Sequence, residues 1–421
     1  MTYIISMFIV FIILEMPYIL LLIWGFLLKT HEGDSTPEPL TYPEVVVALT
    51  CYSEGELIEL AIESLAMQDY KGKITVLVIV DGGSKFNRPT VEAGYRMQDK
   101  YPDIDVQVID KPNRYGRVHS NNLGLKYCQE NNIEYLLILD GDTSISLESI
   151  SSFVRMAEHD KEVAGLSGSI KVRNLNSHIT KLTYLEYALG IVLSRFSLGR
   201  LGYTNNISGA FGFFRVSSIA KIGGWRPNSG EDFDLTLRNL IHRNKIKHCE
   251  NAIAYTDSPP TLWELIKQRW IWDGDYLFLI SKYHHYLTPT IVGLRTWFFV
   301  WYNVVITISI PICVLIYTLV LFCVLPLLQA LTIVVVAYMV YFYISCILYA
   351  FYIVLCEQRD ISYELLPYLL LQPCYSYFLR LNDIVAFCNE LLFKQHLSSK
   401  MGPKRVLLRA HLESDDKYIH L

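Results

Sequence analysis

Three groups of acidic residues stand out in the chain, because each lies beside an apolar run. They are Asp81 in VIVDGGS, Asp140 and Asp142 in LLILDGDT, and Glu231 with Asp232 in GEDFDLT. Carboxylate oxygens suit Mg²⁺ or Mn²⁺, and such a cation neutralises a diphosphate leaving group as its bond breaks. A further carboxylate can remove the proton from an attacking hydroxyl. These residue types therefore indicate transfer of a group from a diphosphate donor to a hydroxyl acceptor.

The first candidate site is the pair Asp140 and Asp142. Both follow an apolar run, and Gly141 between them permits a tight turn. Magnesium usually takes one or two protein carboxylates beside phosphate oxygens, so the pair predicts a site for Mg²⁺ or Mn²⁺. Asp-Gly also marks ordinary turns, and this simpler interpretation stays open on the motif alone.

The second candidate is Asp232, which we expect to act as the general base. The sequence GED followed by FDLTLRNLI is typical of a loop that enters a helix. Acidic side chains at such a position also stabilise the helix N-terminus, which is the alternative explanation. Glu231 and Asp234 are neighbours that could serve in place of Asp232.

Alternating patterns around these residues predict an α/β domain. Short β-rich runs cover 45–50, 74–81, 106–110 and 135–140, and helical spacing covers 56–68 and 120–131. The alternation favours a mainly parallel sheet with covering helices. Ligands bind beyond the carboxyl ends of strands in such sheets. Asp81 and Asp140 each end a strand, so we expect them to meet in one crevice.

The 421-residue chain is more apolar than a typical soluble protein, with 52% hydrophobic and 13% aromatic residues. The middle of the chain has ordinary globular composition, so the excess lies at the ends. A net charge of −4 offers no basic surface for nucleic acid, which we exclude as a partner. The nine cysteines show neither a CxxC pair nor a zinc-type spacing, and we expect them to be reduced.

Apolar segments at both ends predict membrane helices. The run 3–28 is long enough to cross a bilayer, and a signal peptide is less favoured because no Lys or Arg precedes the run. Lys29 places the following residues in the cytoplasm. Glu15 is costly within such a run, which indicates a partner or pathway, although snorkelling or protonation would also explain it. Two further spans are expected over 297–325 and 330–355.

Other segments are expected at the membrane surface. The Trp-rich stretch TLWELIKQRWIWDGDYLFLI suits an interface, and the basic tail KMGPKRVLLR suits the cytoplasm. The run 365–393 contains prolines and charges, so we predict interfacial or re-entrant helices, with a fourth span as the alternative. The predicted organisation is a transmembrane helix at 1–29, a linker at 30–43, a cytoplasmic domain at 44–260, an amphipathic segment at 261–296, two transmembrane helices at 297–356, and interfacial helices with a tail at 357–421.

Further motifs extend the pattern of acidic residues. They read TCYSE at 50–54, GRVHSNNLG at 116–124, SGAFGFFR at 208–215 and GGW at 223–225. In this order, the motifs from 45 to 275 resemble those of the inverting family 2 glycosyltransferases. The resemblance is strongest to the membrane-bound processive synthases of hyaluronan, chitin, cellulose or poly-N-acetylglucosamine. It implies a GT-A-like nucleotide-diphospho-sugar transferase domain flanked by transmembrane and interfacial helices.

This resemblance implies a role for each matching residue. Arg117 stands where the family usually has Lys, and it still offers positive charge to phosphate. The implied donor site consists of Tyr52 and Glu54 at the nucleotide, Asp81 on the uracil side, Arg117, Asn122 and Asp140. The implied metal ligands are Asp140 and Asp142, the implied catalytic pair is Glu231 with the base Asp232, and Gly209 lies on the acceptor side.

The last motif departs from the family pattern. The family's Gln-x-x-Arg-Trp is matched by Gln268 and Trp272, but Ile271 stands at the Arg position. Arg269 or Arg238 would have to supply the missing charge at the diphosphate. We expect Gln268, Arg269 and Trp272 on the acceptor side, where Trp272 offers an aromatic platform for a sugar. Anchoring at the membrane interface is the alternative for Trp272.

Three functions from different classes follow. The leading one is a plasma-membrane enzyme that uses a UDP-sugar with Mg²⁺ or Mn²⁺ and extends a β-linked polysaccharide, with export through its own helices. The second is a non-processive enzyme that glycosylates a lipid such as ceramide or a polyprenyl phosphate. The third is an inactive scaffold or translocation subunit, which the retention of every carboxylate disfavours. The sequence leaves open whether an accessory membrane subunit exists.

Overall fold

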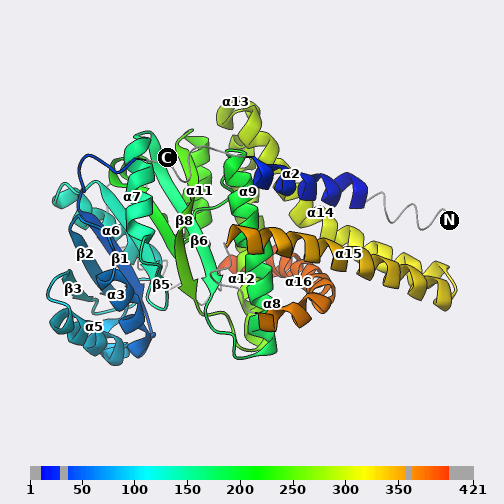
Figure 1. Cartoon of the computed structure of the whole chain (residues 1–421), viewed down its shortest axis with the longest axis horizontal. Helices are drawn as coiled ribbons and strands as arrows, with labels where there is room; N and C mark the ends of the chain where they lie inside the picture. Colours follow the sequence, from blue (N-terminus) through cyan, green and yellow to red (C-terminus); the bar gives the residue numbers. More distant parts are fainter. Residues whose placement is uncertain (1–10, 29–36, 357–362, 398–421) are drawn as a thin grey trace.

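The computed structural model describes residues 11–28, 37–356 and 363–397. Its centre is an eight-stranded sheet with the strand order β3-β2-β1-β4-β7-β6-β8-β5 (Figure 1). The strands are β1 (Val45–Cys51), β2 (Ile74–Val80), β3 (Asp105–Asp110), β4 (Tyr135–Asp140), β5 (Ser144–Ile145), β6 (Val163–Val172), β7 (Phe211–Arg215) and β8 (Lys245–Thr256).

Half of the sheet is parallel and covered on both faces. Strands β3, β2, β1 and β4 pair in parallel, as the alternating pattern predicts. Along β1, Val45 and Val47 belong to one apolar core while Val46 and Ala48 belong to the other, because successive side chains point to opposite faces. Burial on both faces explains why these strands are continuous apolar runs. The two cores fix the carboxyl ends of the strands in place.

The other half of the sheet mixes directions. Strand β7 lies between β4 and β6 and is antiparallel to both, whereas β6 and β8 are parallel. The predicted α/β class with a mainly parallel sheet is confirmed. Insertion of β7 beside β4 brings the turn before β7 to the carboxyl end of β4, where the Asp140 amide donates to the Ala210 carbonyl at 3.2 Å.

Helices cover the sheet and extend beyond it. Around the sheet lie α3 (Ile58–Ala66), α4 (Gly83–Phe86), α5 (Arg88–Lys100), α6 (Arg117–Glu130), α7 (Ser149–His159), α10 (Val216–Lys221) and α11 (Glu231–Ile241). Beyond them are α2 (Met16–Leu27), α8 (His178–Glu186), a π-helical turn (Tyr187–Leu193), α9 (Ser194–Arg200), α12 (Leu262–Tyr283), α13 (Pro289–Val292), α14 (Leu294–Val324), α15 (Leu327–Leu355), a 3₁₀ segment (Tyr363–Leu370) and α16 (Gln372–Phe393).

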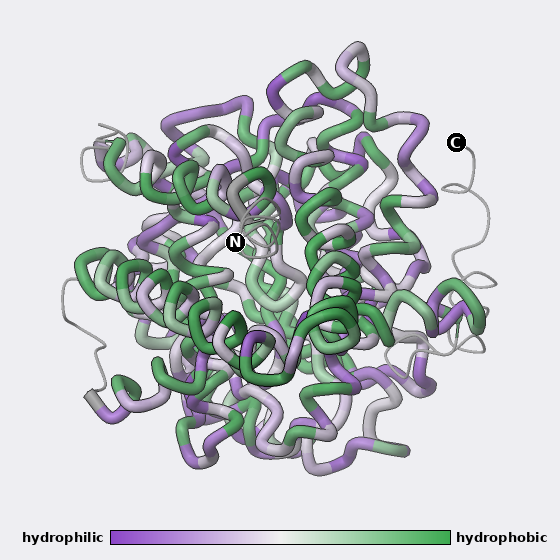
Figure 2. The backbone as a smooth tube through the Cα atoms, turned by 90° about the vertical axis from the view of Figure 1, so that its right-hand side faces the viewer, coloured by the Kyte–Doolittle hydropathy of each residue, from purple (hydrophilic) through white to green (hydrophobic). Residues whose placement is uncertain are grey.

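Two of the described helices are long and apolar enough to cross a membrane. They are α14 and α15. In the most apolar 18-residue stretch of each helix, only 22% and 6%, respectively, is buried inside the molecule. Such low burial differs from that of a core helix in a soluble protein. Both helices run away from the sheet together with the shorter apolar helix α2, and the end of the molecule that they form is largely hydrophobic (Figures 1 and 2).

The predicted spans and interface segments map onto these helices. The expected spans over 297–356 correspond to α14 and α15, and the described part of the first run is α2 with the π-helical turn before it. Helix α16 carries Arg380, Asp383 and Glu390 and is not among the helices that meet the length and hydropathy of a span. The domain boundaries and the position of α16 in a membrane remain predictions. Residues 29–36 of the linker, the charged residues 357–360 and the tail lie outside the described residues.

Glu15 has partners inside the helical region. Its side chain is 7% exposed, and the Arg380 guanidinium lies 2.7 Å from one carboxylate oxygen. The Tyr341 hydroxyl donates to the other oxygen at 2.6 Å. The acid that is unusual in an apolar run therefore joins the first helix to α15 and α16.

Removal of one partner from this buried pair is expected to destabilise the helical region. Arg380→Met leaves the buried Glu15 without its cation but still bonded to the Tyr341 hydroxyl, so the loss should not exceed the roughly 3–5 kcal/mol typical of a broken buried pair. The double variant Glu15→Gln/Arg380→Met removes both charges and should recover much of that loss. Thermal unfolding of the two proteins and of Glu15→Gln in detergent measures the coupling. Strictly additive losses would show that the pair contributes nothing specific.

Candidate active site

The carboxyl ends of β1, β2 and β4 lie side by side. In the register of the sheet, Thr50 pairs with Asp140 and Cys51 pairs with Val80, the residue before Asp81. Asp81 and Asp140 therefore lie at the same end of the sheet, as their positions in the sequence predict, with β1 between their two strands. Asp142 follows in the turn after β4, and its carboxylate accepts from the Thr143 hydroxyl at 3.0 Å.

Helix α11 adds a second pair of carboxyl groups to this edge. Glu231 and Asp232 lie in its first turn, after Gly230 in the left-handed conformation. The Asp232 carboxylate accepts hydrogen bonds from the amides of Gly209 at 3.0 Å and Phe233 at 2.8 Å. The Asn206 side chain donates to it at 3.2 Å. These donors orient the carboxylate and connect it to the turn before β7.

Arg117 lies among these carboxyl groups. Its Nη2 is 2.5 Å from Asp140 Oδ1, and its Nε is 3.0 Å from Glu231 Oε1. The Glu231 contact is an ion pair without hydrogen-bond geometry, because Nε has no hydrogen-bond partner in this arrangement. Nη2 also donates to the Gly209 carbonyl. One guanidinium thus links the end of β4, the start of α11 and the turn before β7.

Burial and mutual repulsion change the acidity of the cluster. Loss of water raises the pKa of Asp140 to about 7; Arg117 opposes this rise, and Asp142, Glu231 and Glu54 add to it. The Asp140 side chain retains 27% of its exposure, so residual water moderates the effect. Burial also raises the pKa of Glu231 and of Glu54. The cluster as a whole therefore favours the arrival of a cation.

Asp81 positions Arg117 through the backbone. Its carboxylate is 5% exposed and accepts from the amides of Tyr115 at 2.7 Å and Gly116 at 2.9 Å. The Lys111 ammonium lies 2.7 Å from the same carboxylate. Gly116 has φ 88°, a conformation that favours glycine, and it directly precedes Arg117 at the start of α6. The predicted contact of Asp81 with uracil remains a prediction.

The remaining residues of the predicted donor site lie close to this edge or support it. Tyr52 is 38% exposed, and the Arg114 guanidinium stacks on its ring with 3.9 Å to the centroid. Asn122 uses both ends of its amide on the Trp225 backbone, at 2.8 Å and 3.0 Å. That arrangement ties α6 to the GGW motif. Donor contact by Asn122 therefore remains a prediction and would act beside this structural role.

Asp234 and Arg238, the alternatives for the base and for the missing motif arginine, are engaged with other partners. Asp234, the neighbour that could replace the base, is fully buried and forms an ion pair with Arg238 at 2.7 Å. The hydroxyl of Tyr283 also donates to Asp234, at 2.8 Å. Arg238 is 3% exposed and donates to the carbonyls of Ile222 and Gly224. Both side chains hold α11 in the fold, which leaves Asp232 and Glu231 as the acids of this helix that face the cluster.

The predicted acceptor residues lie on α12. Arg269 is 5% exposed and forms a 3.0 Å ion pair with Glu186, which also accepts from the Tyr375 hydroxyl at 2.8 Å. The Arg269 guanidinium lies over the Trp272 ring, 4.3 Å from its centroid, and Trp272 is 42% exposed. In this structure Arg269 therefore supports Trp272 and engages Glu186. Gln268 is on the same helix, and its buried Oε1 has no hydrogen-bond partner.

Several residues of the site were not predicted from the sequence. Asn206 donates to Asp232, and the Thr50 hydroxyl points to Asp140 at 3.4 Å. Asp275 on α12 is 7% exposed, burial raises its pKa to about 8, and it packs against Gly230 just before Glu231 and Asp232. The two asparagines ahead of the SGAFG motif were a sequence signal for Asn206. Asp275 has no such signal, because it contacts the start of α11 only in the folded chain.

The carboxylate oxygens of this site are of the type that binds a divalent cation. Asp140 and Asp142 offer two hard oxygen ligands, the number that Mg²⁺ usually takes from protein beside phosphate oxygens. Within residues 11–28, 37–356 and 363–397, no three His, Cys, Asp or Glu side chains are placed to hold an ion by themselves. Oxygens from the donor would therefore complete the coordination.

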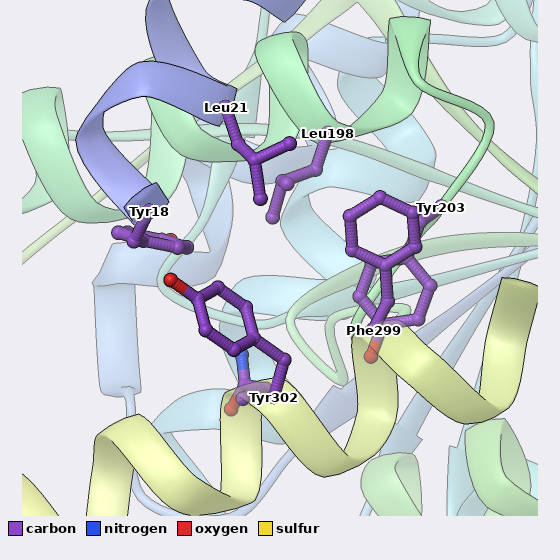
Figure 3. Close-up of a pocket in the computed structure, with 7 residues that line it drawn as sticks. Tyr18, Leu21, Leu198, Tyr203, Phe299 and Tyr302 are labelled. Carbon is purple, nitrogen blue, oxygen red and sulfur yellow. The ribbon is translucent and has the colours of Figure 1, made fainter. Parts of the chain in front are cut away.

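A separate small pocket lies in the helical region. Its lining comes from α2, α9, α14 and the residue Tyr203, and it is formed mainly by aromatic rings (Figure 3). The lining residues are Tyr18, Leu21, Leu198, Tyr203, Phe299, Tyr302 and Asn303. None of them belongs to the carboxylate cluster, so the pocket has no part in the chemistry considered above.

Comparisons with known proteins identify the class of this site. The model of glycosyl transferase family group 2 matches residues 135–355, more than half of the chain, and that of glycosyl transferase family 2 matches residues 46–223. The chain belongs to glycosyl transferase family 2 and is a glycosyltransferase.

Two curated proteins are similar to this chain over about half of its length. Poly-beta-1,6-N-acetyl-D-glucosamine synthase of Staphylococcus aureus (strain COL) is 27% identical over 229 residues, which are 54% of this chain and 53% of that protein. The protein of the same name from Staphylococcus epidermidis is 26% identical over 225 residues, 53% and 52% of the two chains. The chain thus spans about half the length of the curated relatives it matches.

One solved structure has a similar fold over most of its length. A mannosyltransferase from Pyrobaculum calidifontis, in complex with GDP-Man and Mn²⁺, gives a TM-score of 0.60 at 16% identity. The match covers 90% of this chain and 96% of that one. This likeness supports the GT-A-like class of the fold.

Gly209 leaves little room for a side chain between Arg117 and Asp232. An added Cβ would lie 3.2 Å from Arg117 Nη2 and 3.2 Å from Asp232 Cβ. Gly209→Ala should therefore displace one of these groups and lower kcat by about 10-fold or more, since small misplacements are costly in catalysis. Gly190→Ala is the matched control, because nothing lies within 4 Å of its added Cβ. Equal activity of both variants would show that the spacing around Gly209 is unimportant.

Arg269→Ala distinguishes support of Trp272 from contact with phosphate. Loss of the Glu186 ion pair and of the stacking on Trp272 should lower stability by roughly 1–3 kcal/mol and slow transfer to the acceptor. The KM for the donor should stay close to that of the wild type. Lys267→Ala, which removes an exposed cation stacked on Trp263, serves as the control. A raised donor KM with unchanged stability would instead assign Arg269 to the diphosphate.

Proposed function

We propose that this glycosyltransferase transfers a sugar from a UDP-sugar to a growing β-linked polysaccharide at the cytoplasmic face of the plasma membrane. The observation that carries the proposal is the carboxylate cluster at the ends of β1, β2 and β4, with Asp232 held beside it by three N–H donors. Diphosphate chemistry needs a cation site, and hydroxyl attack needs a base. The cluster offers residues for both.

Asp232 is the proposed general base. Its carboxylate is fixed by hydrogen bonds to Gly209, Phe233 and Asn206, so its orientation is set before substrate arrives. It would accept the proton of the acceptor hydroxyl as the oxygen attacks the anomeric carbon. Attack opposite the nucleotide inverts that carbon and gives a β-linked product from an α-linked donor. Glu231 lies beside Asp232 and is in contact with Arg117.

Asp140 and Asp142 are the proposed ligands of Mg²⁺ or Mn²⁺. When bound, the cation would neutralise charge on the departing diphosphate. Tyr52, Glu54 and Asp81 would then accommodate the nucleotide at the ends of β1 and β2. The Mn²⁺ in the complex of the Pyrobaculum mannosyltransferase supports a divalent ion in this class of fold.

Other observations support the proposed acceptor and the membrane arrangement. Relatives named as poly-beta-1,6-N-acetyl-D-glucosamine synthases favour a polysaccharide product, although the match covers about half of each protein. The low burial of α14 and α15 supports membrane insertion. We propose that Trp272 meets the acceptor sugar, because its ring is 42% exposed on α12.

Glycosylation of a lipid is the second candidate. It is favoured by Ile271 in the place of the motif arginine and by the pairing of Arg269 with Glu186, which leave this motif on α12 without a free arginine for the diphosphate. A processive enzyme and a lipid glycosyltransferase differ in the length of their products. Both use the same carboxylates.

The proposal is tested by an assay of purified protein in detergent with separate nucleotide sugars and Mg²⁺ or Mn²⁺. UDP release and product length are measured together, with GDP-mannose as the alternative donor. Long chains from one UDP-sugar support the proposal, and a single sugar on added lipid supports the second candidate. Absence of nucleotide release from every UDP-sugar contradicts the donor assignment.

Asp232→Asn separates catalysis from donor binding. Removal of a general base should lower turnover by about 10²–10⁴-fold and leave the Kd for UDP nearly unchanged. Asp142→Asn is the comparison, since loss of a proposed metal ligand should weaken UDP binding in the presence of Mn²⁺. Calorimetric titration with UDP and a turnover assay give the two readouts. Weaker UDP binding by Asp232→Asn with unchanged turnover of bound donor would contradict its role as base.

A further inference from the structure

Arg117 is a cation already in contact with Asp140, one of the two carboxylates that are proposed to bind a metal ion. It lies 2.5 Å from Asp140 and 3.0 Å from Glu231, and its side chain is 23% exposed. The backbone before Arg117 is held in place, because the amide of Gly116 donates a hydrogen bond to Asp81. The backbone of residue 117 is thus anchored, and the guanidinium is held by Asp140, Glu231 and the Gly209 carbonyl.

Occupation of Asp140 by Arg117 conflicts with occupation by a metal ion. The contact uses Oδ1 of Asp140, and Mg²⁺ would need a ligand oxygen at about 2.0–2.1 Å. A guanidinium at the same carboxylate also repels a divalent cation, since both carry positive charge. In the absence of donor, Arg117 therefore competes with the cation for Asp140.

A nucleoside diphosphate resolves this conflict. It brings phosphate oxygens, for which the planar guanidinium is well suited because it can form two parallel hydrogen bonds. Movement of Arg117 from Asp140 to a phosphate would free Oδ1 for the metal ion. Because the backbone before Arg117 is anchored, we assign the exchange to the side chain, which would also give up its hydrogen bond to the Gly209 carbonyl.

We propose that Arg117 is an exchangeable counter-cation, which holds Asp140 and Glu231 in the resting enzyme and transfers to the donor diphosphate when the nucleotide arrives with its metal ion. This inference rests on the proposed function, because it assumes a diphosphate donor at this edge. Its consequence is that the free enzyme binds the divalent cation weakly and that nucleotide and cation strengthen each other's binding. By linkage, the two effects are equal in size.

The test is titration of the full-length protein in detergent with Mn²⁺, followed by electron paramagnetic resonance, first alone and then with saturating UDP. Arg117→Gln removes the competing charge. Lys126→Gln is the matched control, because it removes one positive charge from the same helix at an exposed position paired with Glu130. Donor turnover is not needed for any of these readouts.

Wild-type protein should bind Mn²⁺ alone weakly and gain at least about fivefold in affinity with UDP, the lower end of typical coupling. Arg117→Gln should bind Mn²⁺ alone at least about fivefold more tightly than the wild type, with a smaller gain from UDP. Lys126→Gln should match the wild type. If Arg117→Gln does not fold, Arg117→Lys replaces it, and it should also bind Mn²⁺ alone more tightly, because an ammonium group cannot span Asp140 and Glu231 as the guanidinium does.

Equal affinity of wild-type and Arg117 variants for Mn²⁺ alone, with Mn²⁺ and UDP still bound together, would overturn the exchange and leave the proposed function standing. Failure of the wild type to bind Mn²⁺ with UDP would overturn both. The two failures are therefore distinguishable in one set of titrations.

Discussion

Repulsion among closely placed carboxyl groups is the constraint around which this site is built. Glu54, Asp140, Asp142, Glu231 and Asp232 converge at one edge of the sheet, where burial raises the pKa of Asp140 and the charges of Asp142, Glu231 and Glu54 raise it further. Arg117 and the N–H donors around Asp232 offset part of that repulsion. The remainder favours a divalent cation at this edge, since the cation brings positive charge to a place that lacks it.

The fold serves this edge in two ways. The parallel strands β1, β2 and β4 end together, so acids that are far apart in the sequence become neighbours. The antiparallel strand β7 then carries the Gly209 turn to the end of β4, where the Gly209 amide and carbonyl contact Asp232 and Arg117. Helix α12 packs against α16, and its Arg269 stacks on Trp272 and pairs with Glu186 at the end of α8.

Sequence alone predicted the parts of the molecule that depend on local pattern. Strands and their ends were predicted because apolar runs stop at polar residues, and this placed Asp81 and Asp140 correctly. The insertion of β7 between β4 and β6 was not predicted, because pairing of a short apolar run depends on segments distant in the chain. The same holds for the contact of Arg269 with Glu186, 83 residues away, and of Asn122 with Trp225, 103 residues away.

The most direct test is a cryo-electron microscopy structure of the protein with UDP and Mn²⁺. The diphosphate should lie at the carboxyl ends of β1, β2 and β4, between Tyr52 and Asp142, with the uracil beside Asp81. Nucleotide bound elsewhere, for example in the aromatic pocket between α2, α9 and α14, or an unoccupied strand edge in a folded protein at saturating UDP, would contradict the assignment of this cluster as the donor site.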